Sequence, residues 1–530
     1  MIKLKRHTIQ CCLILVLTSA FEISPTYGQE YMLEWGDADK SSGQLGSIIP
    51  VSGSNFYALR WSGGILGSLT LSKHEHFKNV LQKRIAMKVA NGMASYEGMQ
   101  RIGGKLIVFL SDRLRGESHF YMQEYGDDLL PKGEAVELAS FVEERVRSKG
   151  SFHIISSRNN GFFGIVWEIP GKNESPDRYG FKIIDSTLQE LSSGEYSLPF
   201  DPKLCSVDQH YLSNTGDYFL SVTEFEKSDR NLFRNYQNYK AIHVFHITPD
   251  EVEDMTIDVQ GKRIDAMTMS SDNNKTFTIL GVYGEKGQPG VSGLIYLKAD
   301  FVRREIIDEG TTKFPKDFIT QDWSQRQKDR AERRESRGRG EPQFYNYVVR
   351  QSEVLKDGSI VGSLEQFYVL LNTFTDPRTG LTRTSYTYYY NDIIAFKVGQ
   401  DGGFDWLSKI KKTQISNNDD GYYSSYLRFL DNGKLCLLFN DHINNYDETG
   451  RFSDTNRFFP TSFSKKRNAV ALVEIDLVDG SVERKMLFDR KDVQALSVPK
   501  KSLVDYNQKN VLIYATYGRK ERFGLMTLRE

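Results

Sequence analysis

One loop of the chain concentrates side chains that can bind a metal ion. Its polar residues are Asn440, Asp441, His442, Asn444, Asn445, Asp447 and Glu448. Calcium prefers oxygen ligands, so Asp441, Asn444 and Asp447 are the candidate calcium ligands. The spacing differs from that of an EF-hand, which has a glycine and a final bidentate Glu at fixed places. Because Asn and Asp also stabilise turns through their side chains, an ordinary loop explains the same residues without any cofactor.

Aromatic side chains gather in two other segments. On an extended strand Tyr386, Tyr388 and Tyr390 share one face, and Tyr389 takes the other. These rings either pack in the core or form an exposed platform that stacks on sugar rings or anchors a protein partner. The candidate partner-binding residues are Trp323, Arg383, Tyr386, Tyr388, Tyr389, Tyr390, Tyr422 and Tyr423.

A polar, basic stretch covers residues 316–339 and is the one place where we expect a helix. Its basic residues are Arg326, Lys328, Arg330, Arg333, Arg334, Arg337 and Arg339. Such a run is typical of a solvated loop or helix, and it also suits an anionic partner such as an acidic polysaccharide. Trp323, just upstream, is either a packing anchor for this segment or an exposed contact.

No complete catalytic constellation accompanies these residues, so the catalytic residues of any reaction are unknown from the sequence. We find no Gly-rich phosphate loop, no nucleophile elbow and no Cys pair at zinc spacing. His74 and His76 could start a zinc site, but no third ligand is in view. The segment 270–277 resembles the Asp-box of sialidases, in which Ser and Asp stabilise a turn and an aromatic residue packs between sheets.

The elements that position these residues recur along the chain. A turn with a small or polar residue precedes an apolar strand in segments 53–59, 103–110, 161–166, 216–222, 274–280, 358–364, 433–439 and 509–514. A second apolar strand follows, and Asp185, Asp300 and Asp476 lie where the carboxylate can bond the next turn. Recurrence at this scale predicts an all-β fold, a β-propeller with eight blades, or seven if two units form one distorted sheet.

The predicted ring is one domain, residues 29–530, and its closure follows from the count of strands. The eighth unit ends after its second strand, and residues 31–35 offer the outer strand that it lacks. Pairing of the N-terminal and C-terminal segments would remove the exposed sheet edges. Cys205 and Cys436 fall in units that are not neighbours in a ring, so we expect no disulfide between them.

Three insertions lengthen the later units, at residues 310–345, 366–391 and 440–467. In a propeller, the loops between the second and third strands of a blade open on the same face as the loops between blades. The three insertions would share that face if segments 367–371 and 457–463 each supply an additional strand, and we expect that they do. Long loops on a rigid scaffold commonly carry function.

The first 28 residues have the organisation of a secretory signal peptide. Lys3, Lys5 and Arg6 precede an apolar run over residues 11–17, and small and polar residues continue to Gly28. We therefore expect an exported protein, periplasmic or extracellular, with no transmembrane segment in the mature chain. The 69 basic and 69 acidic residues balance, which gives no global attraction to nucleic acid. The expected partner is an envelope protein or a polysaccharide.

The later part of the chain, from about residue 281, resembles a group of known sequences. The resemblance is carried by residues 391–394 (Asn-Asp-Ile-Ile), Trp406, residues 409–414 (Lys-Ile-Lys-Lys-Thr-Gln), residues 422–426 and residues 439–441 (Phe-Asn-Asp). They resemble uncharacterised exported β-propeller proteins of Bacteroidetes-type bacteria. This resemblance implies the fold and export, and it implies no particular mechanism. Residues 212–219 also resemble the repeat of periplasmic Tol-type propellers, which act as protein-binding hubs.

Three hypotheses about function follow. The main one is a non-catalytic exported propeller that binds a protein or glycan partner through a rim of long loops on one face. The alternative is a carbohydrate-active hydrolase or lyase whose carboxylates converge at the central channel from separate blades. A third is a part of an envelope assembly or secretion machine.

Overall fold

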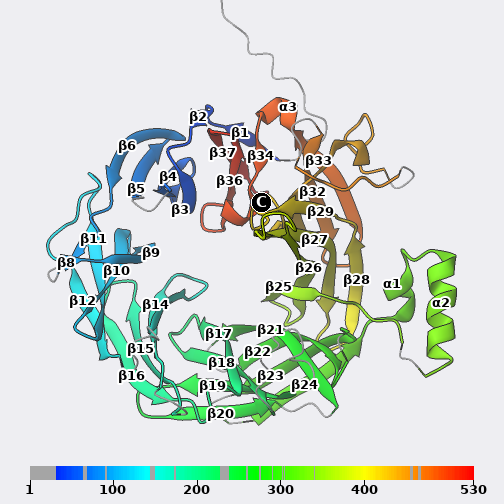
Figure 1. The fold of residues 1–530 in the computed structure, drawn as a ribbon, viewed down its shortest axis with the longest axis horizontal. Coiled ribbons are helices and arrows are strands. Elements are labelled where there is room, and N and C mark those ends of the chain that lie inside the picture. Colours follow the sequence, from blue (N-terminus) through cyan, green and yellow to red (C-terminus); the bar gives the residue numbers. More distant parts are fainter. Residues whose placement is uncertain are drawn as a thin grey trace, which may run out of the picture.

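Sheets of antiparallel strands follow one another around a central opening (Figure 1). The computed structural model describes residues 31–529 except 64–67, 90–91, 144–149, 172–174, 227–237, 258–260, 274–275, 289, 301–302, 304, 339–340, 454–456 and 464–466. Within that part of the chain, eight sheets have four or more strands. The predicted all-β propeller is therefore confirmed. The predicted signal peptide, residues 1–28, lies outside the described residues.

Each sheet except the last takes its four main strands in chain order from the axis outward, and we number the blades along the chain. Blades 1 to 4 are formed by β3 (Gln44–Ser52), β4 (Asn55–Trp61), β5 (Leu69–Glu75) and β6 (Lys78–Arg84); β9 (Ser95–Ile102), β10 (Lys105–Leu114), β11 (Glu117–Tyr125) and β12 (Val136–Val142); β13 (Ser151–Ser156), β14 (Phe162–Ile169), β15 (Arg178–Asp185) and β16 (Glu190–Ser197); and β17 (Cys205–Leu212), β18 (Tyr218–Phe225), β19 (Tyr239–Ile247) and β20 (Val252–Ile257).

The later blades carry the additional elements. Blades 5 to 7 are formed by β21 (Lys262–Asn273), β22 (Thr276–Glu285), β23 (Gly293–Asp300) and β24 (Glu305–Lys313); β25 (Tyr347–Val354), β26 (Ile360–Thr375), β27 (Thr382–Val398) and β28 (Phe404–Ile410), with β29 (Gln414–Asn417) beside β27; and β30 (Leu427–Asp431), β31 (Lys434–His442), β32 (Asn468–Asp476) and β33 (Val482–Asp489). Blade 8 contains β34 (Leu496–Ser497) and β35 (Leu503–Asp505) beside β36 (Asn510–Tyr517), then β37 (Lys520–Thr527), β1 (Leu33–Trp35) and β2 (Asp39–Lys40). The remaining elements are the hairpin of β7 (Lys88–Val89) and β8 (Gly92–Met93), and the helices α1 (Lys316–Thr320), α2 (Gln325–Glu335), α3 (Arg490–Val493), η2 (Ile443–Asn445) and η3 (Pro499–Lys501).

The core lies between neighbouring sheets, and strand alternation builds it. In β10, Leu106, Val108 and Leu110 face blade 1, whereas Ile107 and Phe109 face blade 3. Successive side chains of a strand point to opposite faces, so a central strand that is apolar throughout fills the cores on both sides of its sheet. This explains why the second strand of each blade carried the strongest signal in the sequence.

Two details of the turns agree with the sequence analysis. The carboxylate of Asp185 accepts a hydrogen bond from Thr187 N at 2.8 Å, and those of Asp300 and Asp476 accept from the turn in the same way. Phe277, the aromatic residue of the Asp-box-like segment, is buried and stacks on Phe219 of blade 4 at 4.4 Å. These residues therefore have structural roles.

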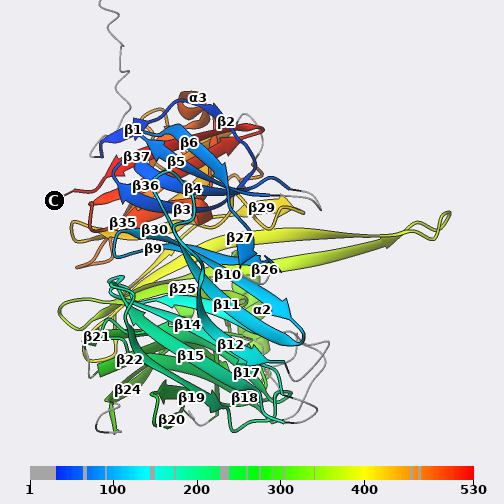
Figure 2. The ribbon, with the colours of Figure 1, turned by 90° about the vertical axis from the view of Figure 1, so that its left-hand side faces the viewer.

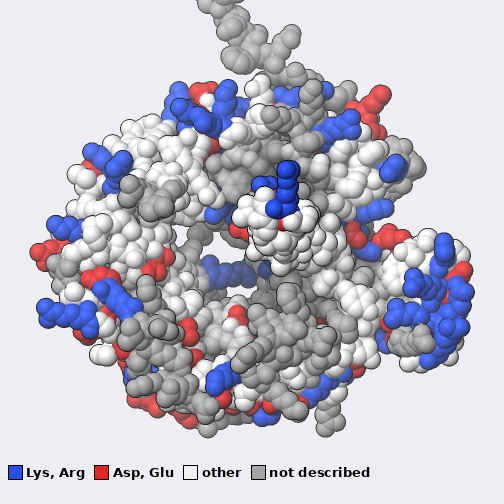
Figure 3. All heavy atoms as spheres, viewed as in Figure 1, with Lys and Arg blue, Asp and Glu red and all other residues white. Residues whose placement is uncertain are grey.

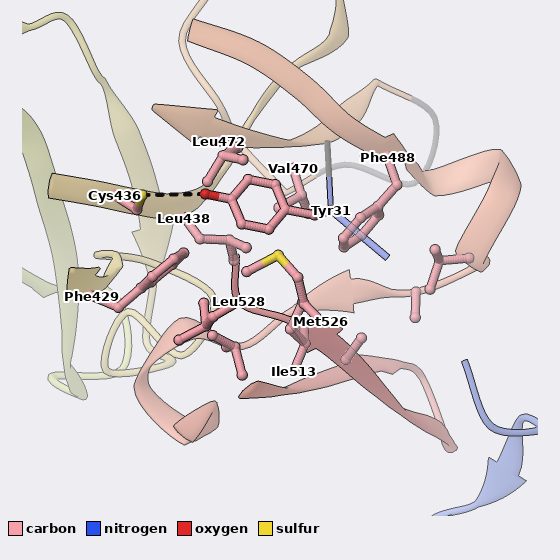
Figure 4. Close-up of a cluster of buried hydrophobic side chains, with 14 residues drawn as sticks. Tyr31, Phe429, Cys436, Leu438, Val470, Leu472, Phe488, Ile513, Met526 and Leu528 are labelled. Carbon is pink, nitrogen blue, oxygen red and sulfur yellow. Dashed lines mark hydrogen bonds between the residues drawn. The ribbon is translucent and has the colours of Figure 1, made fainter. Parts of the chain in front are cut away.

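The ring closes where β1 pairs with β37, so that Leu33 lies opposite Met526 and Trp35 opposite Gly524. The predicted pairing of the N-terminal and C-terminal segments is confirmed. Just before β1, the Tyr31 side chain lies in the core between blades 7 and 8, in contact with residues of both (Figure 4). Its hydroxyl lies 2.8 Å from Asp431 Oδ2 and accepts a hydrogen bond from Arg529 Nη2 at 2.7 Å.

On the other side of blade 8, a buried ion pair joins it to blade 1, because Arg60 Nη2 lies 2.6 Å from Glu521 Oε1.

Cys205 and Cys436 are free thiols. No helix in the described part of the chain is long and apolar enough to cross a membrane.

Candidate functional site

The three insertions open on one face of the ring. One links β24 to β25 and contains α1 and α2, so it connects blades 5 and 6; the other two join β26 to β27 and β31 to β32, which are second and third strands. The insertions share this face for a reason other than the one predicted from the sequence. Residues 367–371 continue β26, and no strand is described within 457–463, so the additional strands predicted there are wrong. The strand that went unrecognised in each blade is its innermost one.

The β26–β27 insertion is a long two-stranded ribbon. Its outer part, residues 367–390, pairs residues 367–375 with 382–390, and we call it the arm. At about 3.3 Å per residue the nine pairs extend for roughly 30 Å. Figure 2 shows the arm in yellow-green, projecting far beyond the face of the ring. Among its exposed apolar residues, Phe374 and Leu381 are each 64% exposed. Arg383 lies opposite Phe374 and is exposed as well.

The base of the arm is held by buried charges. Lys412 Nζ lies 2.8 Å from Glu365 Oε1 and 2.9 Å from Tyr390 O, and both Lys412 and Glu365 are 0% exposed. Glu365 also contacts Arg350 and Ser425. Burial lowers the pKa of Lys412. Because a buried charge is stable only with partners, this network fixes where the arm leaves blade 6.

A pocket of about 530 Å³ lies beside the arm where it joins the ring, and we call it the base pocket. It is lined by Gln44, Tyr386, Tyr388, Asn418, Asp419, Asp420, Tyr422, Val498, Lys500 and Lys501. The predicted residues Tyr386, Tyr388 and Tyr422 therefore meet in one cavity. The lysines and the two aspartates were missed, because no motif links η3 to a loop some 80 residues earlier.

The other predicted aromatic residues lie around this pocket. Tyr389 points to the opposite face of the arm and stacks on Tyr368 at 4.6 Å. Tyr390 is buried, and its hydroxyl accepts a hydrogen bond from Lys500 Nζ at 2.7 Å. Tyr423 is half-buried and bonds Thr516 at 2.9 Å. Partial burial, together with nearby Arg350, lowers the pKa of Lys500 to about 8.

The helical insertion lies away from the arm, on the outside of the ring (Figure 1). Trp323 packs against the core between blades 5 and 6, which agrees with its reading as a packing anchor. Lys and Arg side chains gather over α2 (Figure 3). The residues of α2 and its C-terminal end that share one surface depression are Arg326, Arg330, Arg333, Arg334 and Arg337.

The central channel contains a cavity of about 950 Å³ on the side of blades 1 to 4. The opening is visible beside the arm in Figure 3. The titratable residues that line it are Tyr96, Glu97, His153, Glu168, Tyr179, Asp208 and His210. Most come from innermost strands, which alternate between the channel and the sheet interfaces.

Asp208 and His210 are channel groups whose pKa values are shifted. Strands of the channel wall replace much of the water around Asp208 and raise its pKa to about 6, although the residue remains accessible, and Thr223 Oγ1 donates to it at 2.6 Å. Burial and the neighbouring His153 lower the pKa of His210 to about 4. The two imidazoles stack at 5.1 Å. A carboxyl group that is partly protonated near pH 6 can act as an acid or a base.

The candidate calcium residues have other partners. Asp441 is buried, pairs with Arg484 and accepts a hydrogen bond from Tyr446 at 2.7 Å. Asp447 Oδ1 accepts from Thr449 N at 2.8 Å, and Asn444 N donates to His442 Nδ1 at 3.1 Å. Among the described residues, no group of three or more His, Cys, Asp or Glu side chains could hold a metal ion. The calcium site stays a prediction that these contacts do not support.

Comparisons with known proteins concern the fold. No protein-family model matches the chain, and no curated protein matches it. The WD40 domain of SCAP from fission yeast is similar over 94% of this chain and 94% of its own, with 9% identity and a TM-score of 0.38. An oligogalacturonate lyase in complex with manganese is similar over 92% of this chain and 99% of its own, with 9% identity and a TM-score of 0.34. Similarities this low carry no argument about function.

Proposed function

We propose that this chain is a non-catalytic exported binding protein that holds an envelope protein partner on the arm. The observation that supports the proposal is the exposure of apolar side chains along a ribbon that stands clear of the ring. Val369, Leu370, Leu371, Phe374 and Leu381 are all exposed there. Contiguous exposed apolar surface on a soluble protein commonly marks an interaction site.

The backbone of the arm also offers a contact. From residue 368 to 375, β26 pairs only with β27 among the described strands. An isolated two-stranded ribbon is only marginally stable in water, so a partner that packs on it or adds a strand offsets this exposure. We infer export from the signal peptide predicted at residues 1–28. An exported protein would meet its partner in the periplasm or outside the cell.

Three substitutions at the end of the arm test the proposal: Leu371→Ser, Phe374→Ser and Leu381→Ser in one variant. The matched control changes three exposed apolar residues of other blades, Val142→Ser, Val478→Ser and Val482→Ser. Each protein is cross-linked in an envelope extract, and the captured partner is identified and purified for a direct binding titration. We expect wild type and control to bind the same protein with equal affinity. The affinity of the arm variant for that protein should be at least tenfold lower. Equal binding by the arm variant would refute the proposal.

The central channel supports a second candidate function, a carbohydrate-active hydrolase or lyase. The observation that favours it is the presence of Glu97, Glu168 and Asp208 in one cavity, with the pKa of Asp208 raised. The test is incubation with neutral and acidic polysaccharides, followed by a reducing-end or unsaturated-sugar assay. Activity that Asp208→Asn abolishes would replace the binding proposal, and activity that survives in that variant would exclude Asp208 as its acid or base.

A further inference from the structure

The base pocket is assembled from four segments that are distant in sequence. Gln44 lies at the start of β3, Tyr386 and Tyr388 lie on β27, residues 418–422 form the loop after β29, and Lys500 and Lys501 belong to η3. The pocket therefore touches blades 1, 6 and 8. Its volume of about 530 Å³ falls within the roughly 300–1,000 Å³ that is usual for small-molecule sites.

The aromatic wall of the pocket has a fixed orientation. The rings of Tyr386 and Tyr388 are stacked with an interplanar angle of 26°. The Tyr388 hydroxyl donates to Asp420 Oδ1 at 2.7 Å, and Tyr386 N donates to Asn418 Oδ1 at 2.8 Å. Tyr386 nevertheless remains 46% exposed. A ring that its neighbours hold in place while its surface stays open is suited to stacking on a flat, weakly polar ligand face.

The approach of the 418–422 loop to the arm depends on one glycine. Gly421 has a φ of +60°, and a Cβ at this position would lie 2.3 Å from the Tyr390 ring. Any other residue would be strained and would push the loop away. The loop is thus held against Tyr390, which in turn contacts Lys500.

The polar wall carries equal numbers of opposite charges, Asp419 and Asp420 against Lys500 and Lys501. Lys500 Nζ donates to Tyr390 Oη at 2.7 Å and to Asp420 O at 3.0 Å, and Lys501 Nζ donates to Gly46 O at 2.6 Å. An ammonium group has three donors and a carboxylate has about four acceptor sites, so both kinds of group keep capacity for a ligand. The pocket therefore offers donors and acceptors side by side without a net charge.

We propose that the base pocket binds a neutral saccharide, with a pyranose face on Tyr386. Sugar hydroxyls both donate and accept hydrogen bonds, which matches carboxylates and ammonium groups at opposite positions of one cavity. A sugar acid or sulfate would meet the two carboxylates as well as the two ammonium groups and so gains no net attraction, and an apolar ligand would leave the remaining hydrogen-bonding capacity of the four charged groups unused. This site is formed at the base of the arm by Tyr386 and Tyr388, and its lining does not include Phe374 or Leu381 at the end of the arm.

The experiment is a calorimetric titration of the full chain with neutral oligosaccharides, namely cello-, malto-, xylo- and manno-hexaose, and with hexagalacturonate as the acidic probe. We expect at least one neutral probe to bind and hexagalacturonate to bind at least tenfold more weakly. Tyr386→Ala should weaken the neutral probe at least tenfold. The matched control is Tyr345→Ala, because Tyr345 is also 46% exposed and lies outside the pocket.

Lys500→Met provides a second variant that keeps the aromatic wall, and it should also weaken the neutral probe severalfold. Circular dichroism verifies that each variant is folded. Three outcomes would overturn the proposal. The first is that no neutral probe binds, and the second is that hexagalacturonate binds as tightly as the neutral probes. The third is that both pocket variants bind the neutral probe as wild type does. A double variant at the end of the arm, Phe374→Ser with Leu381→Ser, leaves Leu371 opposite Tyr386 unchanged and should bind the sugar as wild type does, so failure of the protein contact and failure of the sugar site are distinguishable.

Discussion

Closure of the ring through Tyr31 predicts a large and graded loss of stability when this side chain is trimmed. Tyr31 is 2% exposed and lies in the core shared by blades 7 and 8. Removing its ring in Tyr31→Ala creates a cavity, and large-to-small substitution of a buried aromatic residue costs about 3–5 kcal/mol. The hydroxyl contributes separately through Asp431 and Arg529, and hydrogen bonds to charged groups are each worth about 1.5–3 kcal/mol.

Because Asp431 and Arg529 still pair with each other without the hydroxyl, we expect Tyr31→Phe to lower the free energy of unfolding by about the value of one such bond, about 1.5–3 kcal/mol. Tyr31→Ala should lower it by several kcal/mol more. Urea unfolding with an unchanged slope measures both losses. Met32 is the matched control, since it is the next residue and 75% exposed, and Met32→Ala should change stability by no more than about 0.5 kcal/mol. If Tyr31→Ala is no more destabilising than Met32→Ala, pairing of the two chain ends does not stabilise the ring.

Three further predictions concern charged groups. Lys412→Met should cost up to about 3 kcal/mol in urea unfolding, because buried Glu365 loses its ammonium partner; a double variant with Glu365→Gln that recovers nothing would contradict this. Burial lowers the pKa of His246, but two neighbouring carboxylates raise it more, so the net shift is upward. His246→Asn should therefore lower Tm more at pH 6 than at pH 8.5, since the stabilisation is lost as pH rises through the raised pKa; a larger gap at pH 8.5 would contradict it. Calcium or EDTA should leave Tm unchanged, because Arg484 already neutralises Asp441; a rise with calcium would restore the predicted site.

The central strands of each sheet could be predicted from the sequence because they are apolar on both faces. The innermost strands could not, because many of their side chains line the central channel. In β13, for example, none of the six residues is fully buried, so the alternation that marks a half-buried strand is weak. Because the innermost strands were not recognised, the second strand of each blade was taken for the first, and the insertions were assigned to the wrong loops. The order of the blades around the ring was predicted correctly.

Only some residues of the candidate site could be predicted from the sequence. Tyr386 and Tyr388 could be recognised because alternation on one strand places them on one face. Lys500 and Asp420 could not, since they meet only when the loop after β29 folds against η3. Asp441 was misjudged for a related reason: its partner Arg484 lies on another strand of the blade, and without a structure an oxygen-rich loop looks the same whether a cation or a guanidinium faces it.

The pairing of Leu33 with Met526 has a consequence for the order of assembly on the ribosome. Residues near the beginning of the polypeptide must wait for nearly 500 others to be synthesised before their partner strand exists. Contacts of such long sequence separation form slowly. The first blades can fold during synthesis, while the seam remains open and vulnerable to proteases until translation has passed residue 527.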